Sequence, residues 1–229
     1  MTNWQHFWDH KAKPTEDPQT QVARTIQGKA ADAETLARIS TYISQQLDLQ
    51  AQDRLLDVCC GNGALTQVLA QQVDETVGVD FSVPHLEVAR QQFGGEQLSY
   101  LRGDARQLST LSLAPFDKIC LYFSFQYFDT YRDGAQVVQE MARLLKPSGR
   151  ILIGDVPDWD RLSVFYPKTY DRFRYHLARW RGRDQMGRFW KKSQLMRMAD
   201  EAGLSCQPVL QPDFLPYAHY RVDYVLGRR

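Results

Sequence analysis

Apolar and polar positions along the chain follow two alternating patterns. Short apolar runs that end at polar or glycine-rich turns alternate with longer segments in which apolar residues recur every three or four positions. The first pattern is typical of buried strands and the second of amphipathic helices. Together they predict strands at 54–59, 76–80, 98–104, 116–125 and 150–156, and helices at 64–73, at 83–93 and from 134 to a stop at the Lys-Pro-Ser-Gly stretch 146–149. This alternation favours a parallel sheet with helices on both faces.

The segments on either side of this alternation have patterns of their own. Residues 32–48 repeat apolar side chains on one helical face, and Trp4, Phe7 and Trp8 lie at helical spacing in a polar leader. An aromatic and arginine-rich stretch precedes a further helix and a final pair of strands. We therefore divide the chain into a lid segment (1–31), a core (32–156), a substrate-binding insertion (157–192) and a C-terminal helix and strand pair that completes the core (193–229).

Composition narrows the class of protein. The 229 residues carry a net charge of +1 and a hydrophobic fraction of 43%, which suits a soluble globular domain with additions to its core. No apolar stretch reaches the roughly 18 residues of a membrane span, and the leader lacks the apolar segment of a signal peptide. We expect a cytoplasmic protein without a membrane span, and the near-neutral charge argues against nucleic-acid binding. The four cysteines show neither zinc nor disulfide spacing, so we predict reduced thiols and no metal site.

A glycine-containing loop joins the first core strand to its helix. The stretch LLDVCCGNG, residues 55–63, ends a buried strand with a carboxylate and continues into a turn with little side-chain bulk. Glycines let a ligand approach the backbone, and a helix N-terminus favours a negative group. A nicotinamide dinucleotide site would have the pattern G-x-G-x-x-G, and the third glycine is absent because Thr66 occupies its position.

Three acids end three successive strands. Asp57 precedes the glycine loop, where a carboxylate would repel a pyrophosphate but suit an ammonium group. Asp80 ends the next strand, at the position from which an acid accepts both hydroxyls of a ribose. Asp104 ends the third strand, and its carboxylate is able to accept a hydrogen bond from an adenine amino group. Together they match an adenosine that carries an amino-acid tail, which is S-adenosylmethionine (SAM).

These segments resemble the class I SAM-dependent methyltransferases, whose first motif is D/E-x-G-x-G-x-G. The resemblance covers about residues 32–156 and more loosely 193–229, and Cys59 replaces the first glycine of the motif. It implies a three-layer Rossmann-like α/β sandwich with a helical lid and a mostly parallel seven-strand sheet, ordered 3-2-1-4-5-7-6 with strand 7 antiparallel. It also implies SAM as the cofactor, bound by Asp57, Cys59, Gly61, Asn62, Gly63, Asp80, Phe81, Asp104, Ala105 and Leu121.

Candidates for the acceptor side come from the later strand ends and the insertion. We predict catalytic roles for Tyr122, Asp155 and His176, with His219 as another possible base, and substrate binding by Tyr122, Gln126, Arg172 and Arg174. Residues 161–192 hold ten basic and two acidic residues, a net +8. This excess fits a solvated helix face, a pocket for a phosphate- or carboxylate-bearing small molecule, or docking to an acidic protein or nucleic acid. In related enzymes a lid closes over the donor carboxylate, a role that Arg24 or Lys29 could fill here.

The function predicted from these residues is methyl transfer from SAM to a small acceptor, with an anionic acceptor as one reading. Two alternatives remain, a nicotinamide-dependent oxidoreductase and a non-catalytic SAM-binding protein. An RNA or protein methyltransferase is a minority alternative, since no part of the sequence resembles a separate RNA-binding module. The acceptor atom and the oligomeric state stay open, because oxygen, nitrogen and carbon acceptors share this fold.

Overall fold

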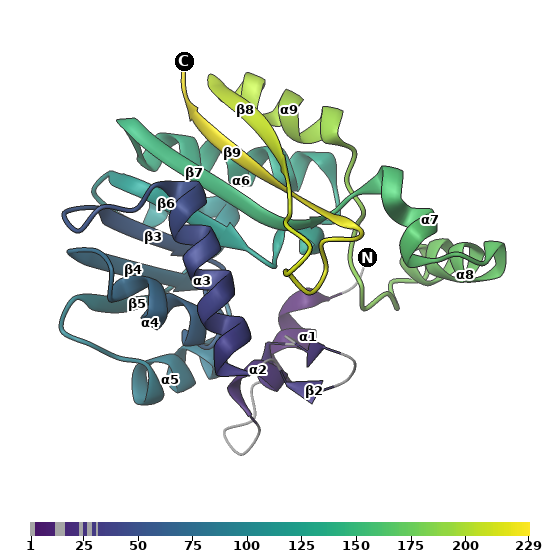
Figure 1. Ribbon diagram of the computed structural model, residues 1–229, viewed down its shortest axis with the longest axis horizontal. Coiled ribbons are helices and arrows are strands. Elements are labelled where there is room, and N and C mark those ends of the chain that lie inside the picture. Colours follow the sequence, from purple (N-terminus) through teal and green to yellow (C-terminus); the bar gives the residue numbers. More distant parts are fainter. Residues whose placement is uncertain (1–2, 12–16, 23–24, 27–28, 31) are drawn as a thin grey trace.

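A seven-stranded sheet forms the centre of the protein (Figure 1). The computed structural model describes residues 3–11, 17–22, 25–26, 29–30 and 32–229. The strands of this sheet are β3 (Arg54–Val58), β4 (Glu75–Asp80), β5 (Leu98–Arg102), β6 (Phe116–Tyr122), β7 (Leu145–Pro157), β8 (Leu204–Leu210) and β9 (Arg221–Arg228). They lie in the order β5-β4-β3-β6-β7-β9-β8, and β9 is antiparallel to both of its neighbours. This confirms the expected order 3-2-1-4-5-7-6 with an antiparallel seventh strand.

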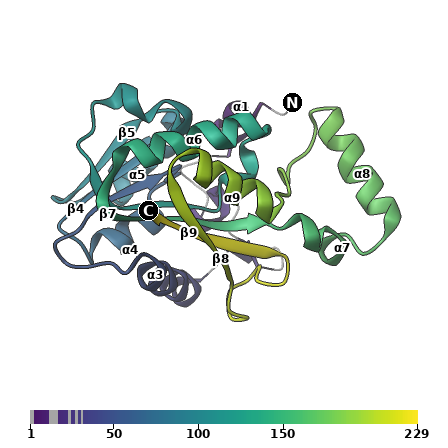
Figure 2. The same cartoon turned by 90° about the horizontal axis from the view of Figure 1, so that it is seen from above.

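Helices cover both faces of the sheet, as the alternating pattern predicts (Figure 2). On one face lie α6 (Tyr131–Leu144) and α9 (Lys192–Glu201), and on the other lie α3 (Ala33–Leu47) and α4 (Ala64–Ala70). Helix α5 (Val83–Gln92) packs beside β4 and β5. Short 3-10 helices follow β5, β6 and β7, at Ala105–Leu111, Phe125–Tyr127 and Trp159–Arg161. The three-layer Rossmann-like sandwich is therefore confirmed.

Strand β3 shows why the sequences of these strands are continuous apolar runs. Leu55 packs with the α3 and α4 side of the sheet, whereas Leu56 and Val58 pack with the α6 and α9 side. All three side chains are fully buried because helices cover both faces. Asp57 shares a face with Leu55, so its carboxylate faces the α4 side.

Two predicted boundaries differ from the structure, each for a local reason. The helix expected from residue 134 to a stop at residues 146–149 ends at Leu144 as expected, but it begins earlier, at Tyr131, because the Thr130 side chain caps it by accepting a hydrogen bond from the Asp133 N–H. The strand expected over 116–125 ends at Tyr122, because Phe123 takes a left-handed conformation with φ of +68°. A capping side chain and one strained residue thus set ends that local periodicity does not reveal.

The leader and the insertion form small elements outside the sheet. The leader contains α1 (Trp4–Asp9), α2 (Pro18–Gln21), β1 (Thr25–Ile26) and β2 (Lys29–Ala30). The insertion contains α7 (Leu162–Phe165) and α8 (Thr169–Trp180), which lie beyond one end of the sheet (Figures 1 and 2). Within the described ranges, no helix combines the length and apolar character needed to cross a membrane.

Candidate active site

A cavity of about 440 Å³ lies at the carboxyl ends of β3, β4, β5 and β6. Strand β3 pairs with both β4 and β6, so the chain builds outward from β3 in both directions and the strand order reverses there. Open α/β sheets bind ligands outside the strand ends at such a switch point. The strand-end residues that line the cavity are Cys59, Cys60, Gly61, Asp80, Phe81, Asp104, Ala105, Arg106, Tyr122, Phe123 and Ser124.

The loop after β3 is held in an unusual backbone conformation. Cys59, Gly61 and Gly63 have φ values of +62°, +59° and +80°, all in the left-handed region. A Cβ atom at Gly63 would lie 2.4 Å from the hydroxyl oxygen of Tyr100, so only glycine fits there. Cys59 stands where the family motif has its first glycine, and its side chain costs about 1 kcal/mol in this conformation. The loop geometry is therefore kept although the first glycine is not.

The two adjacent thiols stay uncharged. Burial, followed by the nearby carboxylates of Asp80 and Asp57, raises the pKa of both Cys59 and Cys60 well above its ordinary value. Both thiols are therefore protonated at neutral pH, and they add no negative charge beside the loop.

Asp80 fixes the loop to the end of β4. Its Oδ2 accepts a hydrogen bond from the backbone N–H of Gly61 at 2.9 Å, and its Oδ1 accepts one from Ser82 N–H at 2.8 Å. Burial raises the pKa of this carboxyl, and the two N–H donors oppose the rise. The carboxylate is thus oriented in the cavity wall at the position expected of a ribose acceptor.

Three other predicted cofactor residues lie behind the loop and do not line the cavity. Asp57 Oδ2 accepts a hydrogen bond from Thr66 Oγ1 at 2.6 Å, which ties β3 to the first turn of α4. Asn62 is fully buried and donates from Nδ2 to Gln21 Oε1 of α2 at 3.2 Å. Gly63 caps the N-terminus of α4. These residues position the loop and connect it to the leader.

At the end of β5, Asp104 is engaged by a neighbouring arginine. The guanidinium of Arg106 donates to both oxygens of Asp104, at 3.0 Å from Nε to Oδ1 and 2.6 Å from Nη2 to Oδ2, and it also reaches Asp133 at 3.3 Å. Burial opposes ionisation of Asp104, but the hydrogen bonds from Arg106 outweigh it and lower the pKa. Ala105 and Phe81, both predicted cofactor residues, line the cavity beside this pair.

Helix α1 supplies an aromatic wall. The ring of Trp4 lies 4.6 Å and that of Trp8 lies 5.2 Å from the ring of Tyr127, and all three rings line the cavity. At the other end of α1, Asp9 Oδ1 accepts a hydrogen bond from Ser82 Oγ at 2.6 Å. The helix predicted from the tryptophan spacing is therefore present, and its two tryptophans form part of the cavity wall.

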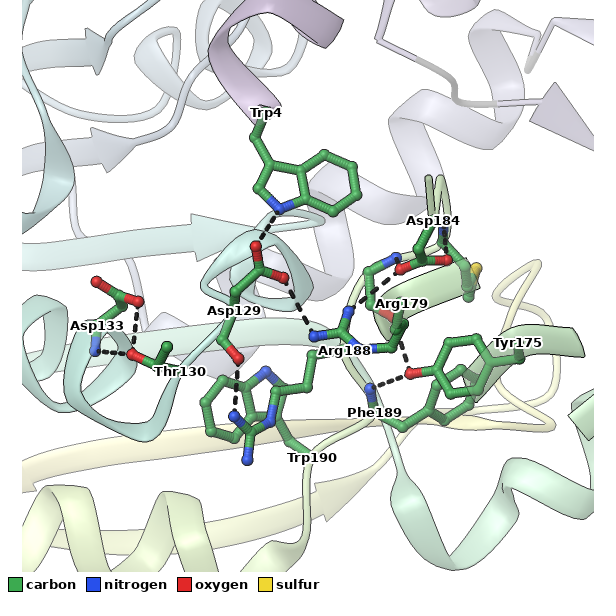
Figure 3. A network of polar contacts seen from close by, with 12 residues as sticks. Trp4, Asp129, Thr130, Asp133, Tyr175, Arg179, Asp184, Arg188, Phe189 and Trp190 are labelled. Atoms are coloured by element: carbon green, nitrogen blue, oxygen red, sulfur yellow. Dashed lines mark hydrogen bonds and ion pairs between the residues drawn. The ribbon is translucent and has the colours of Figure 1, made fainter. Parts of the chain in front are cut away.

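A polar network joins α1 to the insertion through Asp129, which also lines the cavity (Figure 3). Trp4 Nε1 donates to Asp129 Oδ2 at 3.1 Å, and Arg179 of α8 pairs with Asp129 Oδ1 at 3.1 Å. Arg179 also pairs with Asp184 at 3.1 Å, and Arg188 donates to the Asp129 carbonyl at 2.8 Å. The Asp129 carboxylate, after β6, thus connects α1 near the N-terminus with α8 of the insertion.

Tyr122 lines the cavity, but its hydroxyl belongs to a buried cluster. The hydroxyl donates to Asp223 Oδ2 at 3.3 Å and accepts from Gln211 Nε2 at 3.2 Å. Burial, then the carboxylates of Asp223 and Asp155, raises the pKa of Tyr122 well above its ordinary value. The phenol is therefore protonated and held within the cluster.

The remaining strand-end candidates lie away from the cavity. Asp155 is 2% exposed, has φ of +58° at an irregularity of β7, and pairs through Oδ2 with Arg221 at 2.7 Å. Gln126 is buried and donates to the Phe123 carbonyl at 2.7 Å. Leu121 is fully buried inside β6.

The structure also places the insertion candidates elsewhere. Arg172 donates to the carbonyls of Tyr166 and Pro167 at the start of α8. Arg174 stacks on Tyr170, and His176 lies on the exposed side of α8. The second base candidate, His219, is exposed after β8. Arg24 and the side chain of Lys29 lie outside the described residues.

Several lining residues did not appear among the predicted site residues, among them Trp4, Trp8, His85, Arg106, Tyr127, Phe128, Asp129 and Asp133. The tryptophan spacing already indicated a helix in the leader, and residues 127–129 directly follow the fourth core strand, where a ligand was expected. Nothing in the sequence indicated the ion pair between Arg179 and Asp129, whose partners lie 50 residues apart.

Comparison with known proteins assigns the core of the chain to a family. Residues 56–153 match the profile of a methyltransferase domain. The chain is 33% identical over 135 residues to a demethylmenaquinone methyltransferase of Shouchella clausii, covering 54% of this chain and 56% of the relative. It is 30% identical over 172 residues to a ubiquinone biosynthesis O-methyltransferase of Idiomarina loihiensis, covering 71% of this chain and 66% of the relative. The chain thus spans between about half and two thirds of these two curated relatives.

The chain belongs to the class I SAM-dependent methyltransferases. Its fold matches that of the N-methyltransferase NodS from Bradyrhizobium japonicum in complex with S-adenosylhomocysteine (SAH), with a TM-score of 0.67 at 15% identity over 99% of this chain and 98% of that one. This family membership confirms the resemblance inferred from the glycine loop and the three strand-end acids, and it favours SAM over a nicotinamide cofactor. In this methyltransferase, the cavity lies at the same switch point as those motifs.

Proposed function

We propose that this methyltransferase transfers the methyl group of SAM to a small, planar aromatic acceptor inside the cavity at the ends of β3 to β6. One observation carries the proposal: a single cavity is bounded by the glycine loop and Asp80 on one side and by the aromatic rings of Trp4, Trp8 and Tyr127 on the other. A methyl group moves in line from sulfur to its acceptor, so both reactants must share one enclosed space.

The strand-end residues fit the donor. Each oxygen of Asp80 accepts one backbone N–H, and a carboxylate oxygen has a further lone pair for a ribose hydroxyl. We assign the adenine to the space beside Phe81 and Ala105, and the amino-acid tail to the backbone of the loop at Gly61. Asp57 would act through Thr66, by fixing the first turn of α4 behind that loop.

Charge and shape select the acceptor. Among the described residues, the cavity is lined by four carboxylates, Asp80, Asp104, Asp129 and Asp133, and by one guanidinium, Arg106. This balance favours the cationic sulfonium of the donor and disfavours a phosphate- or carboxylate-bearing acceptor. The aromatic lid suits a flat ring, and two relatives carry names that refer to menaquinone and ubiquinone. We therefore propose a hydroxylated aromatic acceptor in place of an anionic one.

The chain contributes positioning and exclusion of water to this reaction. SAM supplies a methyl group on a positively charged sulfur, which aromatic faces and carboxylates stabilise. Helix α1 closes the space above the acceptor, held at its two ends by Asp129 and Ser82. The Tyr122 hydroxyl is engaged by Asp223, so its proposed part is to shape the wall near the methyl group.

Calorimetric titration with SAH tests the donor site. We expect the variant Asp80→Asn to bind SAH about tenfold to a hundredfold more weakly, because it loses charge-assisted hydrogen bonds to the ribose. Asp74→Asn, which removes an exposed acid just before β4, serves as the matched control and should bind as the wild type does. Unchanged affinity in Asp80→Asn would remove the ribose role of Asp80.

Turnover with a panel of catechols and hydroquinones tests the acceptor, with release of SAH as the readout. The expected result is methylation of at least one member and none of its phosphorylated analogue. Tight SAH binding without turnover across the panel would favour the non-catalytic alternative. Turnover of only the anionic analogues would contradict the acceptor class.

A further inference from the structure

The outward face of α8 is aromatic. Tyr170, Phe173 and Trp180 recur at helical spacing with Leu177 between them, and the three aromatic side chains are 67%, 62% and 79% exposed. A surface helix normally turns such a stripe toward the core. Here the buried residue of α8 is Tyr175, on the opposite side, so the apolar stripe faces solvent.

Cations flank this stripe. Arg174 and Arg181 lie on the same side of the helix as Tyr170, one helical turn and three turns further along the chain. Within the described part of the chain, neither guanidinium forms an ion pair with a carboxylate, and Arg174 stacks on the ring of Tyr170. Residues 161–192 carry a net +8 although the whole chain carries only +1, so the positive charge is concentrated around this helix.

The helix is firmly attached and prominently placed. Tyr175 is buried and its hydroxyl donates to the Gly187 carbonyl at 3.0 Å, and Arg179 pairs with Asp129 and Asp184. Helices α7 and α8 project beyond the end of the sheet, away from α3 to α5 (Figures 1 and 2). The stripe is thus presented on a fixed projection that is able to approach a flat surface.

We propose that α8 docks this protein on the surface of a membrane that contains anionic lipids. An interfacial helix lies in the membrane plane with Trp and Phe at the acyl boundary and with Arg near the headgroups. The stripe at 170–180 has this composition and orientation, and Arg174 and Arg181 complement phosphate headgroups. The inference rests on α8 alone and does not depend on the acceptor proposed above.

A bilayer accounts for the combination of features better than other partners do. The three rings lie along a single side of one helix, which suits a planar apolar surface, whereas a groove in a protein would receive a more compact cluster. A second copy of the chain would bring the same cations face to face, and like charges in contact oppose association. Nucleic acid would use the cations but would leave most of the apolar stripe in water.

Sedimentation with vesicles tests the proposal, comparing phosphatidylcholine vesicles with vesicles that also contain phosphatidylglycerol. We expect the wild type to bind the anionic vesicles and to lose binding as salt is raised. The double variant Phe173→Ser/Trp180→Ser should bind at least about tenfold more weakly, because two apolar rings are lost. Arg174→Gln/Arg181→Gln should lose about fivefold for each cation removed, and only on anionic vesicles.

Phe214→Ser, at a half-exposed ring between β8 and β9, is the matched control and should bind as the wild type does. Circular dichroism and SAH binding confirm that each variant is folded. Absence of wild-type binding to anionic vesicles, or equal binding by Phe173→Ser/Trp180→Ser, would overturn the proposal. A wild-type dimer that this variant dissociates would assign the stripe to a second copy. Salt-sensitive RNA binding without vesicle binding would assign the cations to nucleic acid.

Discussion

Replacing Asp223 by asparagine tests the buried cluster behind Tyr122. Asp223 is fully buried, and its Oδ1 accepts hydrogen bonds from the Asp155 N–H at 2.6 Å and from Gln211 Nε2 at 2.8 Å. Burial, together with the neighbouring carboxylate of Asp155, raises the pKa of Asp223 from 3.8 to about 7, although its N–H donors oppose the rise. Asparagine keeps an oxygen for the same donors and presents its amide N–H to the Tyr122 oxygen, so it imitates the protonated acid.

The sign of the pH effect follows from this shift. Between the ordinary pKa of 3.8 and the folded value of about 7, the folded protein holds a proton on Asp223 that the unfolded chain has released. Folding then takes up a proton, so the free energy of unfolding contributed by this group falls as the pH rises. The slope approaches about 1.4 kcal/mol per pH unit, and the total over this window is about 4 kcal/mol. Above about pH 7 the contribution is constant.

Urea unfolding at one-unit intervals from about pH 5 to about pH 8 measures the effect. We expect the stability of Asp223→Asn relative to the wild type to rise steadily up to about pH 7 and then to level off. Other carboxyl groups, whose pKa is lowered on folding, make the free energy of unfolding rise with pH in both proteins. Subtracting the wild-type value from that of the variant at each pH cancels this contribution. Asp74→Asn should run parallel to the wild type. Parallel curves for Asp223→Asn as well would refute the assignment of a raised pKa to Asp223.

Two further predictions address the lid and the loop. Trp4→Phe removes the N–H donor to Asp129 but keeps an aromatic ring, so the KM for the acceptor should rise about tenfold while the affinity for SAH changes little. An unchanged KM in initial-rate measurements would show that this hydrogen bond does not hold α1 over the cavity. Cys59→Gly relieves the strain of a left-handed backbone conformation and should raise the free energy of unfolding by up to about 1 kcal/mol. The control Cys60→Gly, at a buried position with ordinary φ, should lower it. A lower free energy of unfolding in Cys59→Gly would show that the Cys59 side chain stabilises the fold by more than the backbone strain destabilises it.

The cofactor half of the site could be predicted from the sequence because topology does most of the positioning. Parallel strands bring their carboxyl ends to one edge, so a residue at the end of β3, β4 or β5, or just after it, must lie near that edge. Asp80 and Asp104 follow this rule and line the cavity. Asp57 lies one residue before the end of β3, and the alternation of side chains turns it toward Thr66 of α4. Spacing gives a residue's place along the strand, whereas its orientation depends on what packs against it.

The acceptor half could be predicted only in outline, because its residues come from distant segments. Trp4 and Asp129 are 125 positions apart, and no local pattern encodes their contact. The basic excess of the insertion was visible as a count, but the count did not reveal which arginine contacts a residue of the cavity wall. Arg179 reaches Asp129 in the cavity wall, whereas Arg172 closes the first turn of its own helix and Arg174 stacks on Tyr170.

The cysteine in the glycine motif shows how the loop can keep its shape without the expected residue. Cys59 and Phe123 are non-glycine residues in left-handed conformations, and both line the cavity, after the ends of β3 and β6. Such conformations persist only where surrounding contacts determine them, and they concentrate at functional sites. Around Cys59 those contacts are the bond from Cys60 N–H to the Val79 carbonyl and the bond from Gly61 N–H to Asp80. The loop is therefore held mainly by β4. Cys59 in place of the family's first glycine changes the backbone strain in the loop but not the path of its backbone. Asp80 both fixes the loop and faces the cavity.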